Sequence, residues 1–473
     1  MTVPGIVRAL EQAESYREAA SAASADLSLS LVDGLDAPVI AGLIERRRAT
    51  GDPGAVLVIA PTGRRAESLG PALDAVLPGA QVLHFPAWET LPHERLSPSP
   101  ETVGRRLDVL RRIAAWDGEA PLVVTASVRS ALQPLAPGLG EVEPVELVVG
   151  GRGHELESVT TRLVELAYHR VDMVSRRGEF AVRGGILDVF PPVADHPYRV
   201  EFFGDEVDQI RAFSVADQRS LPGEVTAVTL VPSRELLLTP AVRARAAALR
   251  DGYPGLRQLL EKMAEGIPAE GMESLIPVLV DDLVTLVDYL PGGSAVALVD
   301  PERSLARATT LGDTNREFLE AAWSAATAGA DTPVDLDSGD FVTLDDLHER
   351  ARGRGGVWWQ LSAFDSGAAD AEDEGLVIGD DSAHRIKADA VPSFQGNVEG
   401  ATAHVASCWP MAGRSWSRHP APEWWTAPAT CSPSGASRRV VSTTCAFRPS
   451  PGSHTWSARR WSAASSSSKR GSP

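Results

Sequence analysis

The chain has 473 residues, a formal net charge of −18 and 43% hydrophobic residues, enough for about three domains with cores of their own. No apolar run reaches the roughly 20 residues that a bilayer-spanning helix needs, and the first 25 residues are too charged for a signal peptide. We therefore expect a cytoplasmic protein. The three cysteines, Cys408, Cys431 and Cys445, are too far apart for a zinc or disulfide framework, so no metal site is predicted.

Residues 1–138 alternate between apolar runs and helical patterns. Strands are expected at Ala55–Pro61, Gln81–Trp88 and Pro121–Ser127, and helices at Arg64–Leu77 and Thr102–Trp116. This alternation predicts the first half of an α/β domain with a mostly parallel sheet. Trp88 lies in a loop broken by prolines, and we expect it to be a packing residue rather than part of a DNA-binding hairpin.

Residues 139–222 change pattern and predict a small inserted α+β domain. One amphipathic helix is expected at Leu156–Tyr168. Two hairpins follow, one joining Phe180–Arg183 to Ile186–Phe190 and one joining Val200–Phe203 to Val207–Phe213, each through a glycine-containing turn. Together they predict a small antiparallel sheet.

Residues 223–328 are expected to form the second half of the first domain. Its predicted elements are helices at Pro240–Arg250, Gly255–Ala264 and Asn315–Ala328, and a strand at Ala295–Val299. Ile276–Tyr289 fits a strand or a helix. The composition of residues 329–340 predicts a linker, and residues 341–405 predict a third, truncated small α/β domain with a buried strand at Trp358–Leu361.

The last part of the chain, residues 406–473, has an unusual composition. It holds six of the eleven tryptophans, sixteen serines and nine basic side chains against the single acid Glu423, so the first 405 residues carry a formal charge of −26. Such a body is expected to repel a DNA backbone. The tail predicts a disordered, low-complexity segment that a frameshift near Val405 would explain; a natural basic tail is the alternative.

The run Arg177–Pro191, RGEFAVRGGILDVFP, fits the pattern R-G-x-F-x-V-R-G-x-[IL]-[IL]-D-[VI]-F-P. On this run the chain resembles the UvrA-binding domain shared by the nucleotide-excision-repair protein UvrB and the bacterial transcription-repair coupling factors. Phe85–Leu107 and the segment ending at Leu221 resemble the coupling factors in particular. The resemblance covers about residues 1–405 and implies a UvrB-like α/β domain with an inserted UvrA-binding domain.

The resemblance implies that the inserted domain recruits UvrA. Guanidinium groups beside a phenylalanine are typical of interface anchors, and we expect contacts to UvrA from six residues: Arg170, Arg176, Arg177, Phe180, Arg183 and Phe190. For Phe180 and Phe190 the alternative is a place in the core of the sheet, and for Arg176 it is a solvated surface position.

A nucleotide-binding P-loop needs a glycine-rich turn, a lysine and a serine or threonine, and the chain contains no Gly-Lys pair. Where UvrB carries its P-loop, this sequence reads Gly34, Leu35, Asp36, Ala37 and Pro38. These residues lack both lysine and hydroxyl, and they favour an N-capped helix start with Pro38 in the first turn. We expect no cofactor in this chain, although the resemblance implies ATP and magnesium for the full-length parent.

These observations predict a UvrA-recruiting adaptor without enzyme activity. For the full-length parent, the resemblance implies ATP-driven translocation on double-stranded DNA and removal of stalled RNA polymerase, through domains that the prediction places outside this chain. Two alternatives are a non-functional frameshifted fragment and a degenerate UvrB-like nucleotide-binding protein.

Overall fold

The computed structural model describes residues 4–91, 96–327, 341–363, 383–388, 394, 397–400 and 402–404. The chain divides into two units, residues 1–391 and 392–473. In the second unit, residues 398–400 and 402–404 are helical. The expected linker at 329–340 and the expected frameshifted tail at 406–473 lie outside the described residues. All elements below belong to the first unit.

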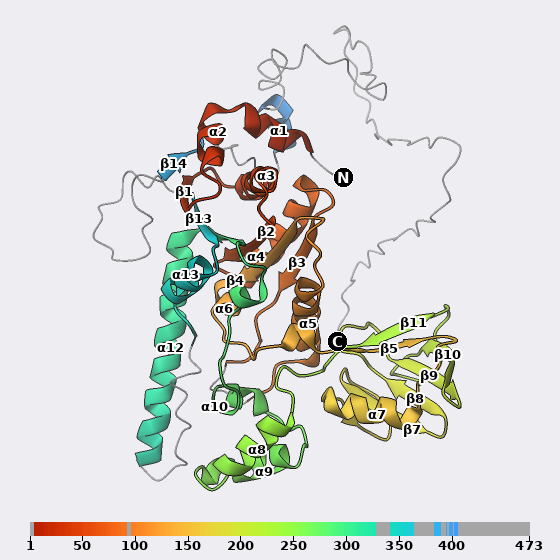
Figure 1. Cartoon of the computed structure of the whole chain (residues 1–473). Coiled ribbons are helices and arrows are strands. Elements are labelled where there is room, and N and C mark those ends of the chain that lie inside the picture. The colour runs from red at the N-terminus through yellow and green to blue at the C-terminus, as the bar shows by residue number, and fades with distance from the viewer. Residues whose placement is uncertain are drawn as a thin grey trace, which may run out of the picture. The chain divides into compact units, whose positions relative to one another are not determined.

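A seven-stranded, fully parallel sheet forms the centre of the first unit (Figure 1). Its strands, in spatial order, are β14 (Ala383–Arg385), β1 (Leu27–Ser30), β13 (Val357–Ser362), β12 (Ala295–Val299), β2 (Ala55–Ala60), β4 (Leu122–Ser127) and β3 (Gln81–Phe85). The strands expected in the first domain are therefore confirmed as one parallel sheet.

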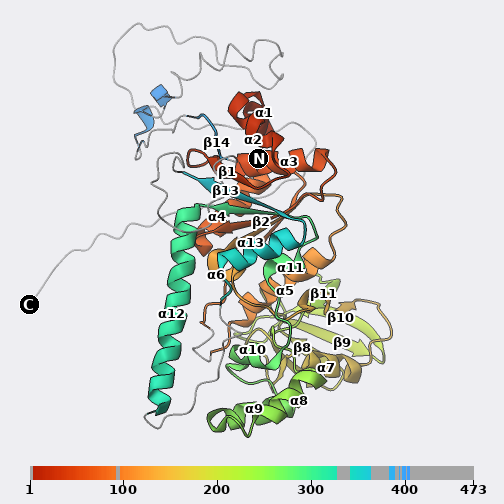
Figure 2. The ribbon, with the colours of Figure 1, turned by 60° about the vertical axis from the view of Figure 1, so that its left-hand side comes forward.

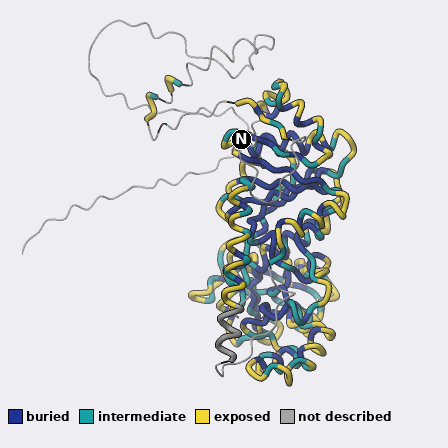
Figure 3. Tube along the Cα trace, turned by 90° about the vertical axis from the view of Figure 1, so that its left-hand side faces the viewer, coloured by how far each residue is buried: buried dark blue, intermediate teal, exposed yellow. Residues whose placement is uncertain are grey.

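Helices cover both faces of this sheet, which explains why its inner strands are continuous apolar runs. Along β2, Val56 and Val58 pack on one face, while Leu57 and Ile59 pack on the other. The first face is covered by α1 (Pro4–Gln12), α2 (Glu14–Ser21), α3 (Asp36–Ala49) and α4 (Gly63–Val76). The second is covered by α5 (Pro100–Ala114), α6 (Val128–Ala131), α11 (Leu286–Tyr289), α12 (Pro301–Thr327) and α13 (Leu344–Gly353). Figure 3 shows the buried residues gathered in the interior, with the exposed residues around them.

The inserted domain, defined here as residues 145–236, has a core of its own. A five-stranded sheet runs β10 (Glu206–Ala212), β9 (Tyr198–Phe203), β8 (Ile186–Val189), β7 (Glu179–Arg183) and β6 (His169–Arg170). A two-stranded sheet pairs β5 (Val145–Val148) with β11 (Ala227–Leu230), and the helix α7 (Leu156–Glu165) packs its Val159 and Leu163 into the core between them. Figure 2 shows this domain on the side of α5.

A small helical segment follows the inserted domain. It contains α8 (Pro240–Leu249), α9 (Arg257–Ala264) and α10 (Ile276–Leu279), with 3-10 turns at Pro254–Leu256 and Met272–Leu275. Trp88 packs into its core with 5% exposure, so the expected packing role of this tryptophan is confirmed. None of the helices in the described ranges combines the length and apolar character that a membrane span requires.

Three expectations about boundaries are wrong. The buried strand at 357–362 does not begin a third domain, because β13 pairs with β1 and β12 inside the main sheet. The inserted domain does not end at 222, because β11 pairs with β5 and Leu230 joins its core. The helix expected from Asn315 already starts at Pro301.

Two other expectations hold with more detail. The small sheet of the inserted domain is present, and the short β6 joins it parallel to β7. Of the strand and the helix that the sequence left open for Ile276–Tyr289, the structure forms helix, as α10 and α11.

Candidate docking surface

The five-stranded sheet of the inserted domain has one face on the core and an outward face that is partly covered. Side chains alternate along each strand, so Phe180, Leu187 and Val200 point into the core with α7. Their chain neighbours lie on the outward face, where Ala181 and Asp188 are themselves buried. The outward face carries a bidentate ion pair in which Arg199 donates to both carboxylate oxygens of Asp188, at 2.7 and 2.8 Å. These hydrogen bonds raise the pKa of Arg199, so this part of the face holds a fixed charge pair.

Three of the predicted contact arginines are exposed. Arg183 lies at the end of β7, immediately before the Gly184 turn, whose φ is +61°, and its guanidinium donates to the carbonyl oxygen of Asp172 at 2.6 Å. Arg170 and Arg176 are also exposed, and neither forms an ion pair with a described carboxylate. All three guanidinium groups are therefore available to a partner.

The other three predicted residues are engaged within the chain. Phe180 is fully buried in the core of the inserted domain, and Phe190, 6% exposed, packs with Ala181 and Phe213. The expected contact role is wrong for both rings, because the chain's own side chains cover them.

Arg177 faces the chain's own helix α5 rather than open solvent. Its guanidinium lies 5.2 Å from the centre of the Phe190 ring, donates to the carbonyl of Ala194 and forms a 3.2 Å ion pair with Glu101 of α5. Arg177 therefore links the inserted domain to the α/β domain.

Phe203 is a surface residue that our sequence reasoning missed. It ends β9, opposite Glu206 and just before the Gly204-Asp205 turn, and 82% of it is exposed. The signal was present in the sequence, because Phe202 points into the core and its neighbour must then point outward. Met173, 55% exposed beside Asp172, is a second exposed apolar residue of this domain.

At the position where UvrB carries its P-loop, this chain has an ion pair at the start of α3. Gly34 adopts a φ of +92° and α3 starts at Asp36. The expected N-cap is wrong, because Leu35 occupies the cap position and offers no side-chain hydrogen bond. Asp36 is 6% exposed and lies 2.5 Å from the guanidinium of Arg65. Burial raises the pKa of this carboxyl and Arg65 opposes the rise.

This arrangement does not fit a bound nucleotide. A phosphate would meet the buried carboxylate of Asp36 where a P-loop presents a lysine, and the nearest guanidinium, that of Arg65, is already paired. In the described part of the chain, no group of acidic, histidine or cysteine side chains is arranged to hold a metal ion.

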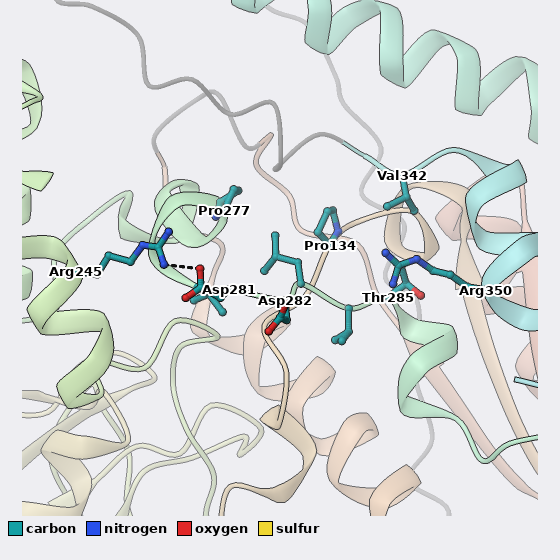
Figure 4. Close-up of a pocket in the computed structure, with 11 residues that line it drawn as sticks. Pro134, Arg245, Pro277, Asp281, Asp282, Thr285, Val342 and Arg350 are labelled. Atoms are coloured by element: carbon teal, nitrogen blue, oxygen red, sulfur yellow. Dashed lines mark hydrogen bonds and ion pairs between the residues drawn. The ribbon is translucent and has the colours of Figure 1, made fainter. Parts of the chain in front are cut away.

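A cavity of about 360 Å³ lies between the helical segment and α13 (Figure 4). Two arginines line it, but Arg245 pairs with Asp281 and Arg350 pairs with Asp288. Asp282, with a φ of +55°, adds a further carboxylate. The cavity therefore offers no unpaired guanidinium to a phosphate among the described residues.

Known proteins are similar to this chain in the same two parts, the inserted domain and the larger region around it. The UvrB interaction domain family matches residues 145–236, a range that includes every strand of both small sheets and the helix α7. Transcription-repair-coupling factor from Mycobacterium bovis is 48% identical over 365 residues, covering 73% of this chain and 28% of that protein. The chain is homologous to the amino-terminal portion of the transcription-repair-coupling factors.

More distant transcription-repair-coupling factors also match the chain. The Bacillus subtilis protein is 30% identical over 320 residues, covering 61% of this chain and 26% of its own length. The Myxococcus xanthus protein is 35% identical over 286 residues, covering 57% of this chain and 23% of its own length. The chain thus spans about a quarter of the length of these relatives, and it includes their UvrB interaction domain.

Proposed function

We propose that this chain binds UvrA through the exposed side chains of its inserted domain and serves as a UvrA-recruiting adaptor in transcription-coupled nucleotide-excision repair. The observation that carries the proposal is the exposure of Arg170, Arg176 and Arg183 on a domain that matches the UvrB interaction domain. Phe203, 82% exposed, adds an apolar anchor to the same domain. Aromatic and arginine side chains are the residues that most often dominate binding energy at protein interfaces.

The same proposal assigns this chain no enzyme activity and no cofactor, and it places the chain in the cytoplasm. It is supported by the Asp36–Arg65 ion pair at the place of the P-loop and by the acidic balance of the first 405 residues. RNA polymerase and double-stranded DNA are proposed as partners of the longer relatives, reached through parts of those proteins that this chain does not match.

The test is a titration of the full chain with purified UvrA. Binding is measured by calorimetry or on a surface that carries one of the two immobilised proteins. Arg183→Ala is expected to weaken binding by about 2 kcal/mol, which is a 30-fold rise in Kd, and Phe203→Ala by a similar amount. Both side chains are exposed, so neither change should lower thermal stability.

Arg303→Ala is the matched control, because Arg303 is an exposed arginine on α12, outside the inserted domain. This variant is expected to bind UvrA like the unmodified chain. Absence of binding by the unmodified chain, when circular dichroism shows it folded, would refute the proposal. Unchanged affinity in both Arg183→Ala and Phe203→Ala would refute the assigned surface.

A further inference from the structure

Three consecutive residues at the end of the inserted domain each bond to a different part of the chain. Ser233 donates its hydroxyl to the carbonyl of Ala167, just after α7. Arg234 bonds to the helical segment, and Glu235 bonds to α5. We call Ser233, Arg234 and Glu235 the junction.

The Glu235 contact is buried and highly connected. Arg106 of α5 donates to both carboxylate oxygens of Glu235, at 2.5 and 3.2 Å, and the two side chains are 0% and 1% exposed. The indole nitrogen of Trp88 donates to the same carboxylate at 2.9 Å, and the Phe85 ring lies 4.2 Å from the guanidinium carbon. Removing one partner of such a pair strands a charge in the interior, so this contact resists opening.

The Arg234 contact ties the junction to two loops. Its guanidinium donates to Glu273 at 2.9 and 3.1 Å and to the hydroxyl of Ser97 at 2.6 Å. Ser97 also bonds to Glu273 and accepts from the backbone of Gly271. In this second charged contact Glu273 is 1% exposed and Arg234 is 21% exposed, so the carboxylate is shielded from water and the guanidinium only partly.

Helix α5 meets the inserted domain again through a glycine. A β-carbon on Gly104 would lie 2.3 Å from Cβ of Pro192 and 3.3 Å from its backbone carbon, so only glycine permits this approach. One turn earlier in α5, Glu101 pairs with Arg177. In the 3-10 turn Leu139–Glu141, which precedes the inserted domain, Gly140 fits against the backbone of Leu110, because a β-carbon there would lie 2.7 Å from the Leu110 oxygen.

We infer that α5 and the junction form a rigid joint that holds the inserted domain in one orientation on the parallel sheet. Opening the joint would separate a buried ion pair, which is strongly unfavourable because it leaves a charge unpaired in the interior, and a glycine contact requires close fit. A partner bound to the inserted domain is then held at a fixed position relative to the α/β domain. The inference concerns the joint alone and holds whichever partner binds.

The test measures the distance between two spin labels in the full chain. The labels are placed on exposed sites, Glu67→Cys in α4 and Thr229→Cys in β11, after the three native cysteines have been replaced by serine. Pulsed dipolar spectroscopy is expected to give one narrow distance distribution. A broad distribution at this stage would overturn the inference.

Two variants then challenge the joint. Gly104→Ala and Glu235→Gln are each expected to at least double the width of the distribution or to shift its mean. Gly70→Ala is the matched control, because Gly70 also lies within a helix but its β-carbon would meet only Val82, at 4.0 Å. It is expected to leave the distribution unchanged. A narrow, unshifted distribution in both test variants would overturn the joint.

A measurement on the unmodified chain covers the case in which a variant does not fold. Hydrogen–deuterium exchange of the Ser233 amide, which donates to the carbonyl of Leu166 at 2.9 Å, and of residues 103–107 in α5 is expected to be as slow as that of β2 and β4. Exchange at least 100-fold faster at Ser233 would mean that the junction opens while the sheet stays folded, and would overturn the inference. UvrA titration is read separately, so failure of the joint and failure of the proposed function are distinguishable.

Discussion

Tyr168 is buried and Tyr289 is half-buried, and only one of the two phenols has a hydrogen-bond partner among the described residues. Tyr168 is 2% exposed in the core of the inserted domain, and its hydroxyl has none. Tyr289 donates to the carbonyl of Ala136 and accepts from the backbone of Leu139. Burial raises the pKa of both, that of Tyr289 to about 12, so neither ionises at neutral pH.

We predict opposite effects of removing these two hydroxyls. Tyr168→Phe removes an unsatisfied polar group and is expected to leave the free energy of unfolding unchanged or to raise it by up to about 1 kcal/mol. Tyr289→Phe leaves two backbone groups without their partner and is expected to lower it by about 1 kcal/mol. Urea denaturation of both variants provides the measurement, and a loss for Tyr168→Phe as large as that for Tyr289→Phe would contradict the prediction.

The raised pKa of Asp36 predicts how stability depends on pH. Above the ordinary aspartate value of 3.8, the folded chain still holds a proton on this buried carboxyl that the unfolded chain has released. Stability contributed by this group is therefore lost as pH rises through the folded-state pKa. Asp36→Asn removes that loss.

The free energy of unfolding of the unmodified chain, minus that of Asp36→Asn, is accordingly expected to decrease as pH rises from 4 to 7. Urea denaturation at several pH values measures this difference. A difference that grows with pH would mean that the ion pair with Arg65 outweighs burial, and would contradict the prediction.

Strand β13 is the element on which the parallel sheet depends. It lies between β1 and β12, and its two tryptophans, both fully buried, pack on opposite faces, Trp358 with the α5 side and Trp359 with the α3 side. Without β13, β1 and β12 each lose a paired strand. The helix layer on each face of the sheet also loses the buried tryptophan that packs against it.

We predict that a fragment ending at residue 330 does not fold cooperatively, although it contains the complete inserted domain. A fragment ending at residue 388 retains β13 and β14 and is expected to unfold in a single transition. Thermal unfolding followed by circular dichroism compares the two. A cooperative transition of the main sheet in the shorter fragment would show that β13 is dispensable.

Local pattern was enough to predict most single elements, but not how they pair. The strand at 295–299 matches its prediction, and the two hairpins of the inserted domain are in the expected places, because alternation and turn glycines act over a few residues. Membership of β13 in the main sheet depends on pairing between Leu27 and Trp359, which no local pattern encodes.

The same limit applies to the candidate surface. Exposure of Arg183 follows from its place before a turn. Exposure of Phe203 follows from the alternation of side chains between the two faces of a strand. Burial of Phe190 depends on Val174 and Phe213, which the fold brings to it from other parts of the inserted domain, and the pairing of Arg177 depends on Glu101 of the distant α5, so the motif alone could not show either contact.

At the scale of the whole molecule, charge is divided between the two parts of the chain. Residues 1–405 carry a formal charge of −26, while residues 406–473 contain nine basic side chains and one acidic one. Repulsion from the phosphate backbone is expected to dominate wherever the acidic part approaches DNA.

We therefore predict that a fragment of residues 1–405 does not bind duplex DNA at 50 mM salt, whereas the full chain binds weakly and loses this binding at 200 mM salt. Fluorescence anisotropy with a labelled duplex measures both. Equal binding by the fragment and the full chain would place a DNA-binding surface on the acidic part and contradict the prediction.

The position of β13 also dictates an order of events during synthesis. The inserted domain closes its core from residues 145–236 alone, so it can fold while the ribosome is still translating the rest. Strand β1, made first, must wait for more than 300 further residues before Trp359 arrives as its partner, and such distant pairing is slow to form. A nascent chain therefore displays a finished inserted domain attached to an unfinished sheet with an open edge, the kind of intermediate on which chaperones act.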